Sequence, residues 1–145
     1  MDTLALRAEH SAIMGLASRL GGIAGAARTR DDAHDARAAI LAIDALLQRH
    51  LAEEDADLYP ALTDAPDAQT RLLGAAAYAE MGGIAGAWAN YRDHWTVEVM
   101  LCHPGRFAAA TEGFIGALSL RIAMENDVLY LAIDRLTGAR RRSAA

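Results

Sequence analysis

The sequence predicts an all-α fold, an up-down-up-down four-helix bundle made from a duplicated helix hairpin. Alanine and leucine, which both favour helices, dominate the 145 residues, and the chain has only three prolines. Apolar residues recur at spacings of three and four along four long stretches, which is the period of a helix. Short connections between long helices place neighbouring helices antiparallel.

The first helix is expected over residues 3–28 and the second over residues 32–62. The turn between them offers Thr29 or Asp31 as the cap of the second helix. Helical spacing of apolar residues marks the second stretch at Ile40, Ile43, Leu47 and Leu51.

The third helix is expected over residues 68–101 and the fourth over residues 105–137. Pro66 precedes the third stretch and suits the start of a helix. Glycines weaken the first and third stretches and allow helices to approach closely, and they are Gly21, Gly22, Gly25, Gly82, Gly83 and Gly86.

The second half of the chain repeats the first. The matched segments are 8–15 with 79–86, 50–55 with 121–126, and 58–59 with 129–130, and each pair is 71 positions apart. One offset therefore pairs the first helix with the third and the second helix with the fourth. This agreement indicates a duplicated hairpin with a pseudo-two-fold axis.

Length and charge predict a single domain over residues 1–138 and a short basic tail at 139–145. The net charge is −5, and the basic cluster of the chain lies in that tail, at Arg140, Arg141 and Arg142. A nucleic-acid-binding domain normally has a basic face, so no nucleic acid partner is expected.

Cysteine usage and hydropathy predict a cytoplasmic protein. The single cysteine, Cys102, cannot form a disulfide within the chain, which favours a reducing compartment. Charged residues interrupt the N-terminal region, so no signal peptide is expected there. No uncharged apolar stretch approaches the roughly 18 residues that a membrane span requires, so no membrane contact is expected.

Six residues from four helices are expected at one level of the bundle. His50 and Glu54 lie four positions apart on one helix face, a spacing that also occurs in solvated surface pairs. Helices rise about 1.5 Å per residue, so residues equally far from a turn on either side reach the same height. The residues that satisfy this condition are His10, His50, Glu54, Met81, Arg121 and Glu125. Polar groups at one level indicate a site inside the bundle.

The motifs at this level resemble the hemerythrin-like HHE family, whose four-helix core holds two irons. The resemblance covers about residues 4–136 and rests on His10, on His50-x-x-x-Glu54 followed by Leu58-Tyr59-Pro60, and on Glu125 followed by Leu129-Tyr130. It implies that His10 and His50 hold the first iron. It also implies that Glu54 and Glu125 are the carboxylates that bridge the two irons.

Met81 and Arg121 stand where the family has the histidines of the second iron. A guanidinium stays protonated and has only donors, so it cannot ligate a cation, and a thioether is a soft ligand for ferric iron. A di-iron centre is therefore not expected. Two outcomes remain open. Either the four other residues bind a single non-haem iron, manganese or zinc ion, or Arg121 pairs with both carboxylates and no metal binds.

Two functions correspond to these outcomes, and neither assigns a catalytic residue. The first is sensing or redox handling of a small diatomic ligand at a mononuclear metal site. The second is a metal-free regulatory or interaction module, with a regulatory protein or a second copy as its partner. Tyr59 and Tyr130 either form hydrogen bonds beside the site or pack in the core. An aromatic stripe either packs at one end of the bundle or forms a dimer interface, and it consists of Trp88, Tyr91 and Trp95.

Overall fold

The computed structural model describes residues 1–144, and every regular element among them is helical. This confirms the all-α prediction. The elements in chain order are α1 (Thr3–Ala26), α2 (Arg30–Glu53), the π-helix η1 (Glu54–Leu58), α3 (Tyr59–Thr63), α4 (Ala68–Met81), α5 (Ile84–His94), α6 (Val97–Cys102), α7 (Pro104–Met124), the π-helix η2 (Glu125–Leu129) and α8 (Tyr130–Ser143).

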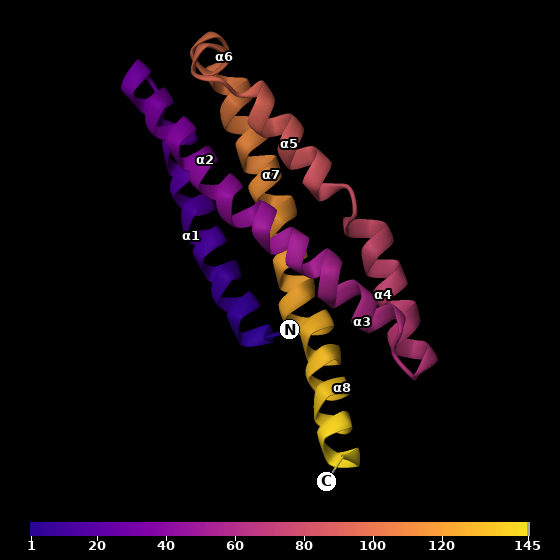
Figure 1. The fold of residues 1–145 in the computed structure, drawn as a ribbon. Helices are drawn as coiled ribbons and strands as arrows, with labels where there is room; N and C mark the ends of the chain where they lie inside the picture. The colour runs from indigo at the N-terminus through magenta and orange to yellow at the C-terminus, as the bar shows by residue number, and fades with distance from the viewer. Residues whose placement is uncertain (145) are drawn as a thin grey trace.

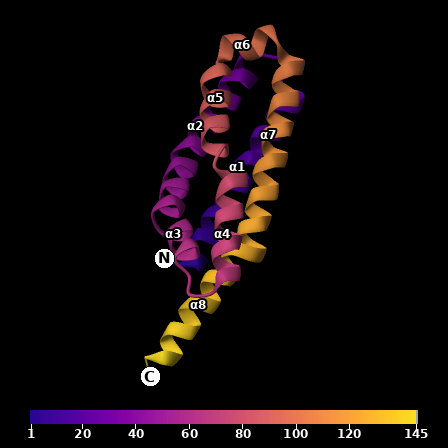
Figure 2. The same ribbon diagram turned by 90° about the vertical axis from the view of Figure 1, so that its right-hand side faces the viewer.

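The helices join into long rods that form a bundle (Figures 1 and 2). α1 leads away from the N-terminus, and the rod made of α2, η1 and α3 returns. α4 and α5 lead back to the short α6, and the rod made of α7, η2 and α8 returns to the end where the chain began. α1 packs against α2 and α7, and α2 also contacts α5 and α6. The chain thus folds into a helical bundle in which rods that follow one another run in opposite directions.

Side-chain caps begin α2 and α4. The Thr29 hydroxyl accepts a hydrogen bond from the backbone of Asp32, whose side chain in turn accepts one from the backbone of Thr29, so the cap of α2 is Thr29 and not Asp31. Asp67 caps α4 by accepting a hydrogen bond from the N–H of Thr70. The helix therefore starts after Asp67, and the preceding proline lies outside it.

The predicted third helix, 68–101, is interrupted at two places. α4 ends at Met81 and α5 begins at Ile84, with two successive glycines at 82–83. Glycine is among the residues least suited to a helix interior, which explains the position of the first break. A second break, at residues 95–96, separates α5 from the short α6 at the end of the bundle.

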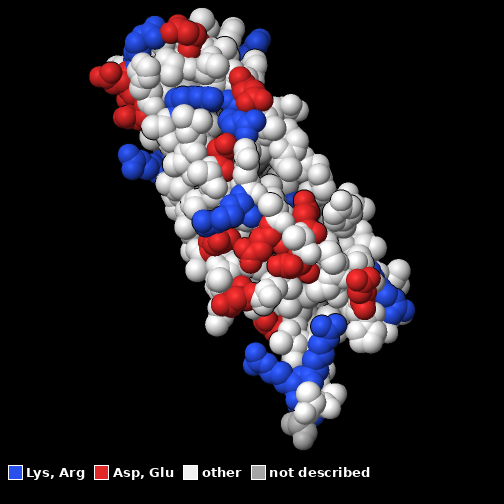
Figure 3. Space-filling model, viewed as in Figure 1, with Lys and Arg blue, Asp and Glu red and all other residues white. Residues whose placement is uncertain are grey.

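The predicted fourth helix, 105–137, continues to Ser143. Three arginines lie in the last turn of α8, where positive charge complements the helix dipole. The predicted tail at 139–145 is therefore helical as far as Ser143, and residue 145 lies outside the described part of the chain. Figure 3 shows blue basic side chains at this projecting end and red acidic side chains gathered over the middle of the same face.

A layer of buried polar residues separates two apolar clusters inside the bundle. On α1, Leu6 belongs to one cluster and Ile13 to the other, and on the next rod Leu58 and Leu47 divide in the same way. The polar residues that fall between the clusters are His10, His50, Glu54, Arg121 and Glu125. The level predicted from sequence is thus a real layer of the interior.

The aromatic stripe, which lies along α5 and at the C-terminal end of this helix, packs inside the bundle. Trp88, Tyr91 and Trp95 are 2%, 8% and 6% exposed. Tyr91 stacks against Phe114, and Trp88 packs against the same ring at an angle of 47°. Trp95 packs against Phe107, and both phenylalanines lie on α7. Of the two interpretations of the stripe, internal packing is therefore the one that the structure supports, because these side chains offer no exposed aromatic face.

The two π-helical turns lie at equivalent positions of the internal repeat. η1 and η2 each span five residues, at 54–58 and 125–129, which are 71 positions apart. In each, the N–H of the tyrosine after the turn bonds to the carbonyl of the glutamate that starts it. Pro60 follows the first tyrosine and Leu131 the second, so a proline does not by itself explain the turns. Such turns are frequent at functional sites.

Gly74 allows the close approach of α4 to α3. A Cβ at Gly74 would lie 2.6 Å from the Cβ of Leu62. We expect Gly74→Ala to lower the free energy of unfolding by about 1–3 kcal/mol through overpacking, although alanine is the better helix former. Gly113→Ala is the matched control, because nothing lies within 4 Å of its Cβ position, and it should stabilise the chain by about 0.5–1 kcal/mol. Urea unfolding followed by circular dichroism measures both, and equal effects would contradict the close approach.

The rod Pro104–Ser143 is long and apolar enough to cross a membrane by length and composition alone, with a window of mean hydropathy 1.3. A core helix of a bundle can pass the same test. Two charged residues of this rod, Arg121 and Glu125, are buried inside the bundle.

Candidate metal centre

Two histidines and two glutamates converge in the polar layer. His10 comes from α1, His50 from α2, Glu54 from η1 and Glu125 from η2. One ligand atom from each lies within 4.8 Å of the others. All four side chains are at most 2% exposed. The structure therefore brings together the four residues that sequence analysis proposed as metal ligands.

The inner nitrogens of the histidines face the carboxylates. The Nε2 atom of His10 lies 3.0 Å from an oxygen of Glu125, and the Nε2 atom of His50 lies 3.2 Å from an oxygen of Glu54. Both pairs are shielded from water, so the groups interact strongly.

The outer nitrogens of the histidines face hydrogen-bond acceptors. The Nδ1 atom of His10 lies 2.8 Å from Oδ1 of Asn126, and that of His50 lies 2.8 Å from Oε2 of Glu9. A carboxylate or an amide oxygen can only accept, so Nδ1 carries the proton in both rings. Each Nε2 atom, which has a free lone pair when the ring is neutral, then points into the centre.

Arg121 is directed inward and contacts both carboxylates. Its Nε donates to Glu125 at 2.5 Å, and one terminal nitrogen donates to Glu54 at 3.1 Å. The other terminal nitrogen donates to the backbone carbonyl of Met81 at 3.0 Å. Burial alone would lower the pKa of Arg121, but Glu125, Tyr59 and Glu54 raise it. The guanidinium is thus a permanent positive charge in the layer.

The two tyrosines of the repeat contact different residues of the site. The hydroxyl of Tyr130 donates to Oε1 of Glu54 at 2.6 Å and lies 3.2 Å from Nε2 of His10. The hydroxyl of Tyr59 lies 3.5 Å from Arg121 and 3.7 Å from the sulfur of Met81. Both tyrosines therefore make polar contacts at the site as well as packing in the core.

The electrostatics of the layer favour charged forms. Burial alone would raise the pKa of Glu54, but His50, Tyr130 and Arg121 lower it. Burial alone would also lower the pKa of His50, yet the carboxylates around it raise it above its ordinary value. The pKa of Tyr130 is raised, mainly by burial, so its hydroxyl is protonated when no cation is present.

Comparison with known protein families agrees with this geometry. The sequence model of the hemerythrin HHE cation-binding domain matches residues 2–133. The chain belongs to the hemerythrin family. The matched span contains every residue of the centre described above. No curated protein and no solved structure matches the chain.

The side chains of this hemerythrin domain fit a cation between the two imidazoles. The Nε2 atom of His50 is buried and, within the described residues, has no hydrogen-bond partner. When the ring is neutral, the lone pair of this nitrogen faces an oxygen of Glu54 that can itself only accept. Such a contact is unfavourable unless a proton or a cation lies between the two atoms. Two imidazole nitrogens and carboxylate oxygens are ligands that iron, manganese and zinc accept.

Sequence reasoning missed two members of the hemerythrin centre, Glu9 and Asn126. Each directly precedes or follows a candidate ligand in the sequence and contacts a histidine at its outer nitrogen. Partners of this kind fix the ring orientation and raise the basicity of a ligating histidine. The position of Glu9 in the sequence could have indicated its role, because the turn of α1 that carries it lies at the level of His50.

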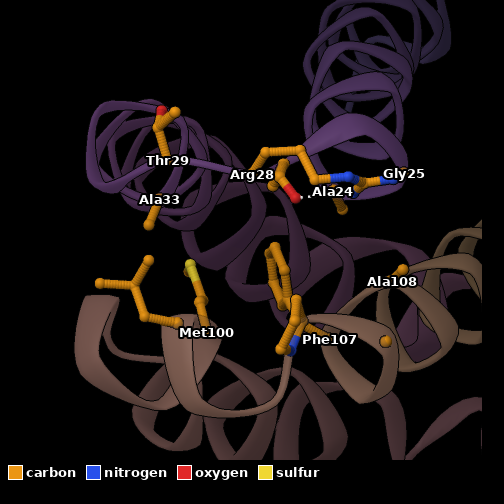
Figure 4. A pocket seen from close by; sticks show the side chains of 12 residues that line it. Ala24, Gly25, Arg28, Thr29, Ala33, Met100, Phe107 and Ala108 are labelled. Atoms are coloured by element: carbon orange, nitrogen blue, oxygen red, sulfur yellow. Dashed lines mark hydrogen bonds between the residues drawn. The ribbon is translucent and has the colours of Figure 1, made fainter.

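A separate cavity lies at one end of the hemerythrin domain, away from the polar layer. It is formed between the α1–α2 turn and the helices α6 and α7 (Figure 4). It has a volume of about 440 Å³ and an apolar lining that includes Met100 and Phe107. Ala24, in its wall, lies 14 positions after His10 on α1, about 21 Å along the helix. As far as the described residues show, its lining contains no His, Cys, Asp or Glu, so it does not belong to the candidate metal centre.

Proposed function

We propose that this hemerythrin-family chain binds one metal ion, with iron as the first candidate, through His10, His50, Glu54 and Glu125. Arg121 takes the place of a second ion as a fixed positive charge. The observation that carries the proposal is the pair of inward lone pairs on the histidines beside a guanidinium that already contacts both carboxylates.

The charge of the site supports a single divalent ion. Three carboxylates contact the histidines or Arg121, namely Glu9, Glu54 and Glu125. One guanidinium and one divalent ion together neutralise them. A second divalent ion would add an excess of positive charge, and burying net charge is costly.

A mononuclear site suits sensing or redox handling of a small diatomic ligand. The protein supplies two nitrogens and two carboxylates, which leaves room for an external ligand on a metal of higher coordination number. The metal would supply the ligand-binding and redox chemistry. His10 and His50 would orient it, their outer partners would hold the rings, and Arg121 would neutralise the carboxylates.

The proposal also covers the topology of the bundle and the compartment in which the protein works. We expect the rods to correspond to an up-down-up-down four-helix bundle derived from a duplicated hairpin, with the two π turns as its clearest structural trace. We also expect the chain to work in the cytoplasm, because Cys102 is free and exposed, which suits a reducing compartment.

Metal analysis of the purified protein tests the proposal. Protein prepared without added iron, then reconstituted with ferrous iron without oxygen, should hold about one metal ion per chain. His50→Ala should lose it, because that change removes a ligand. His34→Ala is the matched control and should keep it, since His34 is exposed and lies on the same helix outside the centre. A chain that remains metal-free after reconstitution would rule the proposal out.

The alternative is a metal-free bundle that acts as a regulatory or protein-interaction module. Arg121 favours it in one respect, because the guanidinium already forms hydrogen bonds with Glu54 and Glu125 without a metal. Its partner would be a regulatory protein or a second copy in a homodimer. The metal analysis above separates the two functions.

A further inference from the structure

The hydroxyl of Tyr130 lies among the candidate ligand atoms. It is 3.2 Å from Nε2 of His10, nearly as close as the 3.0 Å that separates this nitrogen from Glu125. It also lies 2.6 Å from the oxygen of Glu54 that faces His50. A phenol oxygen is therefore a fifth donor atom at the point where the other four converge.

Two contacts hold the ring of Tyr130 in this position. It stacks on the ring of His10 with 5.3 Å between centroids and 11° between planes. The guanidinium of Arg7 lies 5.1 Å from the ring centroid, at a distance that allows a cation–π interaction. Tyr130 is fully buried, so its hydroxyl cannot leave the centre without repacking the core.

We propose that Tyr130 ligates the metal ion in its trivalent state, a role that rests on the proposed metal site. The O–H bond of the phenol breaks, an oxygen–metal bond forms, and the proton passes to water. Displacement of a ligand proton is a general feature of metal binding, and tyrosinate is a known ligand of ferric iron in haem proteins.

Charge explains why the trivalent state is the one that recruits the phenol. With a divalent ion, Arg121 and the metal together balance the carboxylates of Glu9, Glu54 and Glu125. A trivalent ion leaves one positive charge in a layer that is shielded from water, and a phenolate removes it. Arg49 also contacts Glu9, but its side chain is 65% exposed, so water screens its charge.

Tyr59 provides a matched control within the same molecule. It occupies the equivalent position of the repeat, 71 residues before Tyr130, and its hydroxyl faces Arg121 and the sulfur of Met81 instead of a histidine. A comparison of variants at the two tyrosines therefore distinguishes metal ligation from the general effects of a buried phenol near the site.

Visible spectroscopy tests the proposal. The chain is loaded with ferrous iron without oxygen and then oxidised with one equivalent of ferricyanide, which takes one electron and becomes ferrocyanide. We expect a visible charge-transfer band from phenolate to ferric iron, with phenolate ring modes enhanced in resonance Raman spectra. Tyr130→Phe should lose the band and keep its iron, and Tyr59→Phe should keep both.

A second measurement on the unmodified chain avoids any dependence on the folding of the variants. Gallium(III), a redox-inert trivalent ion, should produce the ultraviolet difference spectrum of about one phenolate per chain, and zinc(II) should produce none. Bound ferric iron without a band, gallium without a phenolate signal, or a band that persists in Tyr130→Phe would overturn this inference and leave the metal site standing. Failure to bind any metal would instead defeat the proposed function.

Discussion

Replacing Arg121 by methionine is expected to lower the free energy of unfolding of the metal-free chain by about 3–5 kcal/mol. Methionine keeps much of the apolar stem but removes the charge. Glu54 and Glu125 are 0% and 1% exposed, and both would lose their guanidinium partner without gaining contact with water. Urea unfolding of protein stripped of metal, at neutral pH and monitored by circular dichroism, measures the loss.

Arg30→Met is the control for removing an arginine from an ion pair. Arg30 and its partner Glu98 are 57% and 72% exposed, and surface pairs contribute at most about 1 kcal/mol. If Arg121→Met destabilised the chain no more than Arg30→Met, the guanidinium would not be neutralising buried carboxylates, and its proposed role as a fixed cation would be wrong.

The double change Met81→His with Arg121→His is expected to raise metal content from about one ion per chain to about two, the arrangement of a two-metal centre. The nitrogens of Arg121 lie 2.5 Å and 3.1 Å from the two carboxylates. The backbone carbonyl of Met81 accepts a hydrogen bond from the same guanidinium at 3.0 Å. We expect imidazoles at these positions to take the place of the guanidinium beside Glu54 and Glu125. Metal analysis after anaerobic reconstitution measures the ratio.

The single change Met81→His supplies the control, because Arg121 still fills the second position and metal content should stay near one. Circular dichroism must show that the double variant is folded. A folded double variant that binds only one ion would contradict the idea that the guanidinium replaces a metal.

The convergence of the four candidate ligands could be predicted from sequence because of the simple geometry of the rods. Helices of constant rise with short turns carry His10 and His50 to the same height, and the 71-residue repeat does the same for Glu54 and Glu125. The direction of Arg121 could not be predicted in this way. A long arginine side chain can extend to water, and only the positions of its acceptors in the folded chain decide that it points inward.

Features that depend on individual hydrogen bonds were harder to foresee. Glu9 and Asn126 hold the histidines through side-chain contacts that spacing alone does not specify. The break at 82–83 was visible as weak helix propensity, but whether two glycines end a helix depends on the packing around them. Burial of the aromatic stripe depended in the same way on Phe107 and Phe114 of a distant helix.

The paired π turns have a consequence for length variation in this chain. A π turn contains one residue more than the α-helical turn it replaces, and one residue corresponds to about 100° of rotation in an α-helix. Deleting a single residue from 54–58 or 125–129 would therefore restore an ordinary α-helical turn and leave the remainder of that rod close to its present rotation. Deleting a residue from the α-helical part of the rod just before either π turn would instead rotate Tyr59 or Tyr130 by roughly a quarter of a circle, away from the interior.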